Sequence, residues 1–188
     1  MEKFLEEARK FAYSEMERTG IPSKYQAEVS MEIGRRLAKE LGVNADIVEV
    51  GTLLMDCMIG QAVEENRQSE HVKMSLNKTN ELLGSSSLSE EERENIRHCV
   101  SEHHGVEKFY SKESEVVCNS DCYKFVSIKG FCITLRYTRD MPFADLVILL
   151  KNKADEKWNA ISFDIVKKEL APQHQMILEI LKDLSEEK

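Results

Sequence analysis

Two acidic residues interrupt apolar stretches of the sequence, where a carboxylate is not expected. Asp56 ends the apolar run at 53–55, and Asp121 lies inside the segment EVVCNSDCYKF. A carboxylate in a protein interior is costly unless a cation or hydrogen-bond donors stabilise it. Two like charges that come close together need a cation, a proton or a basic partner. We therefore expect each acid to bind a metal ion or to be paired with such a group.

Histidines gather in the middle of the chain. His71 is expected near the start of one helix, and His98, His103 and His104 near the end of the next, whereas His174 lies far along the sequence. Imidazole together with carboxylate suits Zn, Mn, Fe or Ni. Any single histidine could equally be an ordinary hydrogen-bonded residue. Because the spacings are long, only the tertiary structure can assemble these side chains into a metal site.

Helical periodicity runs through most of the sequence and predicts the elements that carry these residues. The expected helices cover residues 3–18, 24–41, 44–54, 70–83, 90–103, a stretch from 111 onward, 142–158 and 163–184. Ser23, Asn44 and the pair Ser89 and Glu92 supply capping signals at three of the helix starts.

The remaining features predict where helices are interrupted. The segment QAVEENRQSE is expected to be a polar loop, and Pro172 is expected to break or kink the last helix. The predicted fold class is all-α, with about seven or eight helices. We expect residues 1–188 to form one domain, in which residues 142–188 pack on the same core.

Composition and charge restrict the class of protein. The chain has 188 residues, of which 41% are hydrophobic and 32% charged, enough for one domain with a core. A net charge of −8 without a long basic run disfavours nucleic acid as a partner. The charged N-terminal segment does not look like a secretory signal, and the run LVILL is too short to cross a membrane. Five cysteines without a Cys-x-x-Cys pair predict free thiols in the cytoplasm.

The order of the acids and histidines resembles the HD-domain superfamily of metal-dependent phosphohydrolases, in its small single-domain branch. In that family a histidine on an early helix is followed by an apolar run that ends in a His-Asp pair. In GTLLMDC, Met55 and Asp56 fall at the His-Asp pair, and Tyr25 falls at the position of the first histidine. The resemblance covers residues 23–136.

The later part of the family pattern is also represented. The segment ENIRHCVSEHH resembles the helix that carries the later histidines, with His98 and His103 in place, and EVVCNSD places Asp121 at the final acid. His71 followed by Ser75 fits a His-x-x-x-Ser pattern of part of the family. The resemblance therefore implies an HD-like helical domain with a metal held at positions 25, 55, 56 and 121.

Two of those four positions have lost histidine, because the chain carries Tyr25 and Met55, while Asp56 and Asp121 are kept. A phenol with a pKa near 10 and a soft thioether are poor ligands for Mg or Mn. The first interpretation is therefore an HD-like protein that is non-catalytic or weakly active. Its divalent metal (Mn, Mg, Fe, Ni or Zn) would be absent or weakly bound.

The second interpretation is an active metal-dependent phosphohydrolase that acts on a nucleotide or small phosphoester. The residues that it would use are Asp56 and Asp121 for the metal and His71, His98 and His103 for catalysis. Arg136 would contact the substrate phosphate. The third interpretation is a soft-metal or thiol site at Met55, Cys57 and Cys122. A homodimer through apolar positions of the first helix is compatible with all three.

Overall fold

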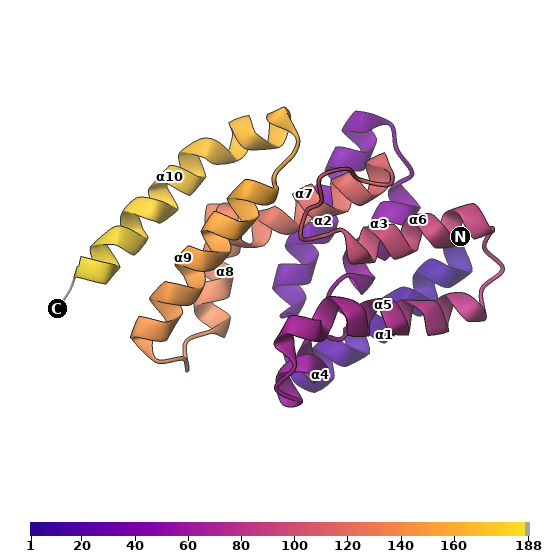
Figure 1. Ribbon diagram of the computed structural model, residues 1–188, viewed down its shortest axis with the longest axis horizontal. Helices are drawn as coiled ribbons and strands as arrows, with labels where there is room; N and C mark the ends of the chain where they lie inside the picture. The colour runs from indigo at the N-terminus through magenta and orange to yellow at the C-terminus, as the bar shows by residue number, and fades with distance from the viewer. Residues whose placement is uncertain (187–188) are drawn as a thin grey trace.

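Helices form all the regular structure of residues 1–186, the part of the chain that this computed structural model describes (Figure 1). The α-helices are α1 (Glu2–Thr19), α2 (Lys24–Leu41), α3 (Ala45–Leu54), α4 (Ile59–Glu64), α5 (His71–Gly84), α6 (Glu90–Ser101), α7 (Lys112–Val126), α8 (Ile128–Tyr137), α9 (Phe143–Ala160) and α10 (Asp164–Glu186). A short 3-10 helix, η1 (Gln68–Glu70), precedes α5. The fold class is therefore all-α. Within the described range, no helix is both long enough and apolar enough to span a bilayer.

Side-chain hydrogen bonds cap the starts of α2, α3, α6, α7 and α8. Ser23 and Ser89 each accept a hydrogen bond from the backbone N–H three residues on, and each forms a full capping box. Asn44 accepts hydrogen bonds from two backbone N–H groups at the start of α3. Ser111 caps α7 in the same way as the other two serines. These side chains satisfy orphan N–H groups without help from distant parts of the chain, so the sequence predicted the helix starts correctly.

Three features differ from the expectation. The described residues contain ten α-helices, because α4 lies in the expected polar loop and α8 was not foreseen. Gly60 of α4 lies against the Thr19 side chain at the end of α1, so this short helix is stabilised by tertiary packing. Pro172 does not break α10, which continues through it. Pro172 and Lys168, whose carbonyl loses its helical partner, are both exposed, so water can satisfy that carbonyl.

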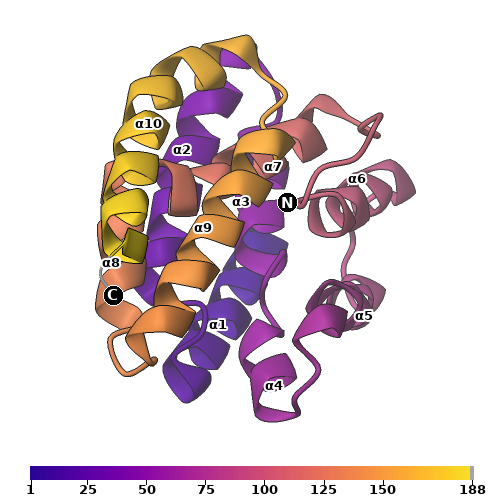
Figure 2. The ribbon, with the colours of Figure 1, turned by 60° about the vertical axis from the view of Figure 1, so that its left-hand side comes forward.

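Two helices in the middle of the molecule carry the core. Every residue of α3 from Ile47 to Leu54 is buried, and α3 packs against α1, α2, α6 and α7. Helix α7 also contacts α2, α8 and α9 and is buried on almost all sides. Figure 2 shows α9 and α10 on one side of these central helices and α5 and α6 on the other. Side chains from both sides can therefore meet where α3 ends beside α7.

The close approach of α3 to its neighbours depends on Gly51. A Cβ atom on Gly51 would lie 2.6 Å from Cys99 Cβ on α6 and 2.9 Å from Val117 Cγ2 on α7. Both distances are shorter than van der Waals contact, so only glycine lets the three helices meet here. This contact lies shortly before Asp56 in the chain, so it helps to position the Asp56 side chain at the end of α3.

We expect Gly51→Ala to lower the free energy of unfolding by about 1–3 kcal/mol, because the new methyl group overpacks the α3–α6–α7 contact. Chemical denaturation followed by circular dichroism measures the change. Gly84→Ala is the matched control, since nothing lies within 4 Å of its added Cβ and alanine favours helix. Equal stabilities of the two variants would contradict this account of the packing.

Candidate functional site

The two acids predicted from the sequence lie close together in the interior. Asp56 follows the end of α3 and is 8% exposed, and Asp121 lies in the middle of α7 and is 1% exposed. Contacts between α3 and α7 bring the two together. Each carboxylate has lost nearly all of its hydration and must be stabilised by protein groups.

A lysine ammonium lies between the two carboxylates. Lys124 Nζ is 2.7 Å from Asp56 Oδ2 and 2.5 Å from Asp121 Oδ1. Lys124 follows Asp121 by three residues on α7, so the two side chains lie on one helix face. Lys124 is itself only 4% exposed. The cation required by the two acids is therefore supplied by the chain.

A second buried lysine completes the group. Lys157 of α9 places its Nζ 2.6 Å from Asp121 Oδ2 and 3.4 Å from Glu156 Oε1, and it is 1% exposed. The two oxygens of Asp121 thus face two different ammonium groups. We call Asp56, Asp121, Lys124 and Lys157 the ion cluster; it joins α7 and α9 to the turn after α3.

The ion cluster changes the pKa values of its members. Burial by itself raises the pKa of Asp56 and of Asp121. Lys124 together with His103 and His71 outweighs burial at Asp56, and Lys124 and Lys157 together with His103 outweigh it at Asp121, so both pKa values lie below their usual range. Burial likewise lowers the pKa of Lys124 and of Lys157, and the carboxylates outweigh it, so both lysine pKa values are raised. All four groups are charged at neutral pH.

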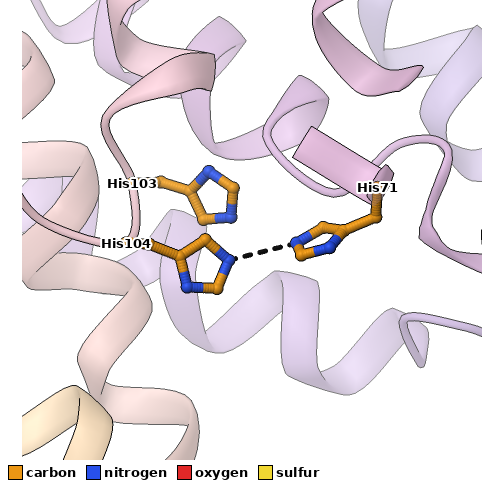
Figure 3. Close-up of side chains that lie close together, drawn as sticks. All are labelled: His71, His103 and His104. Atoms are coloured by element: carbon orange, nitrogen blue, oxygen red, sulfur yellow. Dashed lines mark hydrogen bonds between the residues drawn. The ribbon is translucent and has the colours of Figure 1, made fainter. Parts of the chain in front are cut away.

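Three histidines come together in space (Figure 3), and two of them contact Asp56. His71 begins α5, and His103 and His104 follow the end of α6. One ligand-capable nitrogen from each of the three lies within 4.8 Å of the other two. His71 Nε2 is 3.0 Å from His104 Nε2, the contact that Figure 3 marks with a dashed line. We call these three residues the imidazole cluster.

The other ring nitrogens of the imidazole cluster are held by fixed partners. His71 Nδ1 donates to the Gln68 carbonyl and His103 Nδ1 donates to the Val100 carbonyl, each at 2.7 Å. A carbonyl only accepts, so each neutral ring presents an Nε2 lone pair. Bonding of one ring nitrogen to a backbone carbonyl is typical of metal-ligating histidines.

His104 has two competing partners at its Nδ1 atom, Glu156 Oε1 at 2.8 Å and Lys157 Nζ at 3.1 Å. Glu156 accepts a hydrogen bond from Nδ1–H, and that tautomer leaves the Nε2 lone pair free. Burial lowers the pKa of His104 despite Glu156, so the neutral ring is favoured. The side chain of His104 therefore connects the imidazole cluster with the ion cluster.

Asp56 completes a set of four candidate ligands. Its Oδ1 atom, which does not contact Lys124, is 3.4 Å from His103 Nε2 and 3.5 Å from His71 Nε2. Ligands of a tetrahedral ion with bonds near 2.0–2.1 Å lie about 3.3 Å apart. His103 Nε2 is buried and has no hydrogen-bond partner, as expected of an atom whose partner is an ion. The residues present fit a divalent transition metal.

Other residues expected at the site lie elsewhere. The His98 ring stacks on Tyr110 with a centroid distance of 4.1 Å, and its Nδ1 is 2.7 Å from Glu102 Oε1. It is not part of the imidazole cluster. Arg136 is exposed on α8 and lines a surface hollow together with Tyr137. Neither residue contributes to the candidate site.

The two positions that lack the family histidines are also separate from the imidazole cluster. Tyr25 is 55% exposed, and its ring lies 6.3 Å from that of Tyr137. Met55 is 1% exposed and belongs to the hydrophobic core. Asp56 is therefore the one member of the expected four-residue metal set with a recorded contact to the imidazole cluster, through His71 and His103.

The expected soft-metal site has little support. Cys57 and Cys122 are buried, and in the described residues the group of metal-capable side chains contains no cysteine. Burial raises the pKa of Cys57 to about 12, and a contact with Cys118 together with burial raises that of Cys122. Thiols that stay protonated are poor metal ligands.

Sequence reasoning missed four residues of the site. They are His104, Lys124, Glu156 and Lys157. Lys124 could have been found, because a lysine three residues after an acid in an apolar helix suggests an ion pair. His104 stood next to a predicted site residue. Nothing in the local sequence distinguishes Lys157 from the other lysines of α9.

Fold and site define an all-α protein whose interior holds an ion cluster beside three convergent imidazoles. No protein-family model matches the chain, and no curated protein matches its sequence. In shape the chain is similar to the protein in "The crystal structure of Bacillus subtilis YpgQ", with a TM-score of 0.64 over 97% of this chain and 94% of that chain. The two sequences are 12% identical, so this similarity concerns the fold alone.

We expect Asp121→Asn to lower the free energy of unfolding at pH 7 by about 3–5 kcal/mol, because it leaves buried ammonium groups without their shared partner. Asp140→Asn is the control, since the Asp140 side chain is 94% exposed and its loss changes little. Urea denaturation of the three proteins measures both changes.

The difference between the wild type and Asp121→Asn should depend on pH. The folded-state pKa of Asp121 lies below its unfolded value, so its stabilisation is present above an unfolded pKa of about 3.9 and is lost as the pH falls through the folded pKa. The stability gap should therefore narrow below about pH 4. A gap that stays constant from neutral pH to about pH 2 would contradict this assignment.

Proposed function

We propose that this protein binds a divalent transition-metal ion at the imidazole cluster and Asp56 and uses it to hydrolyse a phosphoester of a nucleotide or another small phosphorylated molecule. The observation that carries the proposal is a group of three histidines, each with one ligand-capable atom within 4.8 Å of the others, of which His71 Nε2 and His103 Nε2 lie 3.5 and 3.4 Å from Asp56 Oδ1. His103 Nε2 is buried and makes no hydrogen bond.

The short distance between the rings of His71 and His104 requires a proton or a cation between them. His71 Nε2 and His104 Nε2 are 3.0 Å apart, and two lone pairs at that distance repel unless a proton lies between them. A metal ion can take the place of that proton and bond both nitrogens. The backbone carbonyls of Gln68 and Val100 accept hydrogen bonds from Nδ1 of His71 and His103. The Nε2 atoms of these two rings are therefore oriented before the ion binds.

The donor set favours Zn, Mn, Fe or Ni over Mg, because three of its four atoms are imidazole nitrogens. A bound ion of this kind polarises a phosphoryl oxygen and acidifies water. Asp56 would contribute Oδ1 as a ligand, while its Oδ2 is paired with Lys124. Glu156 sets the tautomer of His104.

The reaction class comes from the resemblance to HD-domain phosphohydrolases, which is an analogy and is proposed as such. It is supported by an all-helical fold and by Asp56, His71 and His103 lying together in space. The proposed centre differs from the family pattern in using Asp56 without positions 25 and 55. All five cysteines are free, which supports a reducing compartment such as the cytoplasm.

A non-catalytic protein with the same fold is the competing function. One observation favours it: the two acids that the family uses for its metal are neutralised by Lys124. The two functions differ in whether the imidazole cluster holds metal and whether phosphate is released.

Elemental analysis of protein purified without chelator tests the metal centre. We expect about one equivalent of Zn, Mn, Fe or Ni in the wild type and a loss of at least tenfold in metal affinity for His103→Ala. His98→Ala is the matched control, because it removes a histidine that stacks on Tyr110 and does not face the cluster. Metal-free wild type that also fails to bind added Zn or Mn would exclude the proposed function.

Phosphate release from a panel of nucleotides, cyclic dinucleotides and p-nitrophenyl phosphate tests the reaction. Activity should disappear with EDTA and with His103→Ala, return when metal is added to the wild type, and persist in His98→Ala. Stoichiometric metal with no phosphate release across the panel would favour the non-catalytic function instead.

A further inference from the structure

We propose that the Lys124 ammonium permanently occupies the place of a metal ion between Asp56 and Asp121, so that this carboxylate pair does not take up a divalent cation. The juxtaposition that carries the inference is one Nζ atom within 2.7 Å of an oxygen of each acid. The inference is independent of metal binding by the imidazole cluster, because it concerns Asp56 Oδ2, whereas His71 and His103 face Asp56 Oδ1.

The geometry of Lys124 is that of a bridging cation. Its Nζ contacts Asp56 Oδ2 from the turn after α3 and Asp121 Oδ1 from α7, two oxygens that the fold brings together. The Lys124 ammonium donates a hydrogen bond to Asp56 Oδ2 and forms an ion pair with Asp121 Oδ1. With 4% exposure, Lys124 cannot leave for water without uncovering both charges.

Electrostatics disfavours a second cation between the two carboxylates. Glu156 contacts Lys157 and Lys153, so three carboxylates and three ammonium groups balance each other. A divalent ion that shared Asp56 Oδ2 and Asp121 Oδ1 with Lys124 would give this group an excess of positive charge and place two cations on the same two oxygens. Removing the Lys124 charge leaves the group one unit negative and frees both oxygens for a divalent ion.

Positions 25 and 55, where the HD resemblance would supply further ligands, provide none for a metal ion between the two carboxylates. Met55 is directed into the core and Tyr25 is exposed beside Tyr137. Without imidazoles, only carboxylate oxygens are available between Asp56 and Asp121. Oxygen donors suit Mg²⁺, whereas the imidazole cluster suits Zn or Ni. Mg²⁺ is therefore a probe that distinguishes the carboxylate pair from the imidazole cluster.

The experiment compares the wild type with Lys124→Ala in thermal unfolding with and without Mg²⁺. We expect Lys124→Ala to have a lower Tm than the wild type, and about 10 mM Mg²⁺ to raise its Tm by about 3 °C while leaving the wild type unchanged. Lys129→Ala is the matched control, because its exposed ammonium pairs with Glu32 at the surface. It should be insensitive to Mg²⁺.

Two results would overturn the inference. One is a folded Lys124→Ala protein whose Tm does not respond to Mg²⁺. The other is wild-type protein that binds Mg²⁺ in calorimetry and loses this binding in Asp121→Asn. The calorimetric test uses wild type and therefore decides the matter even when Lys124→Ala does not fold. Neither result depends on Zn or Mn at the imidazole cluster, so failure of the proposed function is recognised separately.

Discussion

The burial of Asp121 is the constraint on which the arrangement of the central helices depends. Its two oxygens contact Lys124 and Lys157, and Lys124 also contacts Asp56. A buried charge without its partners is strongly destabilising, so the turn after α3, the face of α7 and the end of α9 must meet at one place. The small residue Gly51 lets α3 approach α7 closely enough for this to happen.

Asp56 connects two kinds of chemistry because its oxygens face different ways. Oδ2 belongs to the ion cluster, while Oδ1 faces His71 and His103. In the ion cluster, the carboxylates of Asp56 and Asp121 are already paired with lysine ammonium groups. In the imidazole cluster, His103 Nε2 makes no hydrogen bond, and backbone carbonyls hold the opposite nitrogens of His71 and His103. This difference between carboxylates that already have cations and ring nitrogens with available lone pairs is the reason for placing the metal centre at the imidazoles.

Parts of the structure that depend on local interactions could be predicted well. Ser23 and Ser89 cap helices through bonds within three residues, and the amphipathic spacing of α1 and α10 is visible in the sequence. Helix α4 was missed because it has no side-chain cap and packs against α1, as the contact of Gly60 with Thr19 illustrates. Helix α8 begins at a local cap, Ser127, which the sequence reasoning overlooked.

The sequence by itself determined that the protein is all-helical, where most helices begin, and that Asp56, Asp121, His71 and His103 are unusual residues. Helical periodicity and capping are short-range effects, so they can be read from neighbouring residues. Only the tertiary structure decided that His104 joins His71 and His103 while His98 turns to Tyr110. It also decided that the cation of Asp121 is lysine, because Lys157 comes from a distant helix and its partner is set by packing alone.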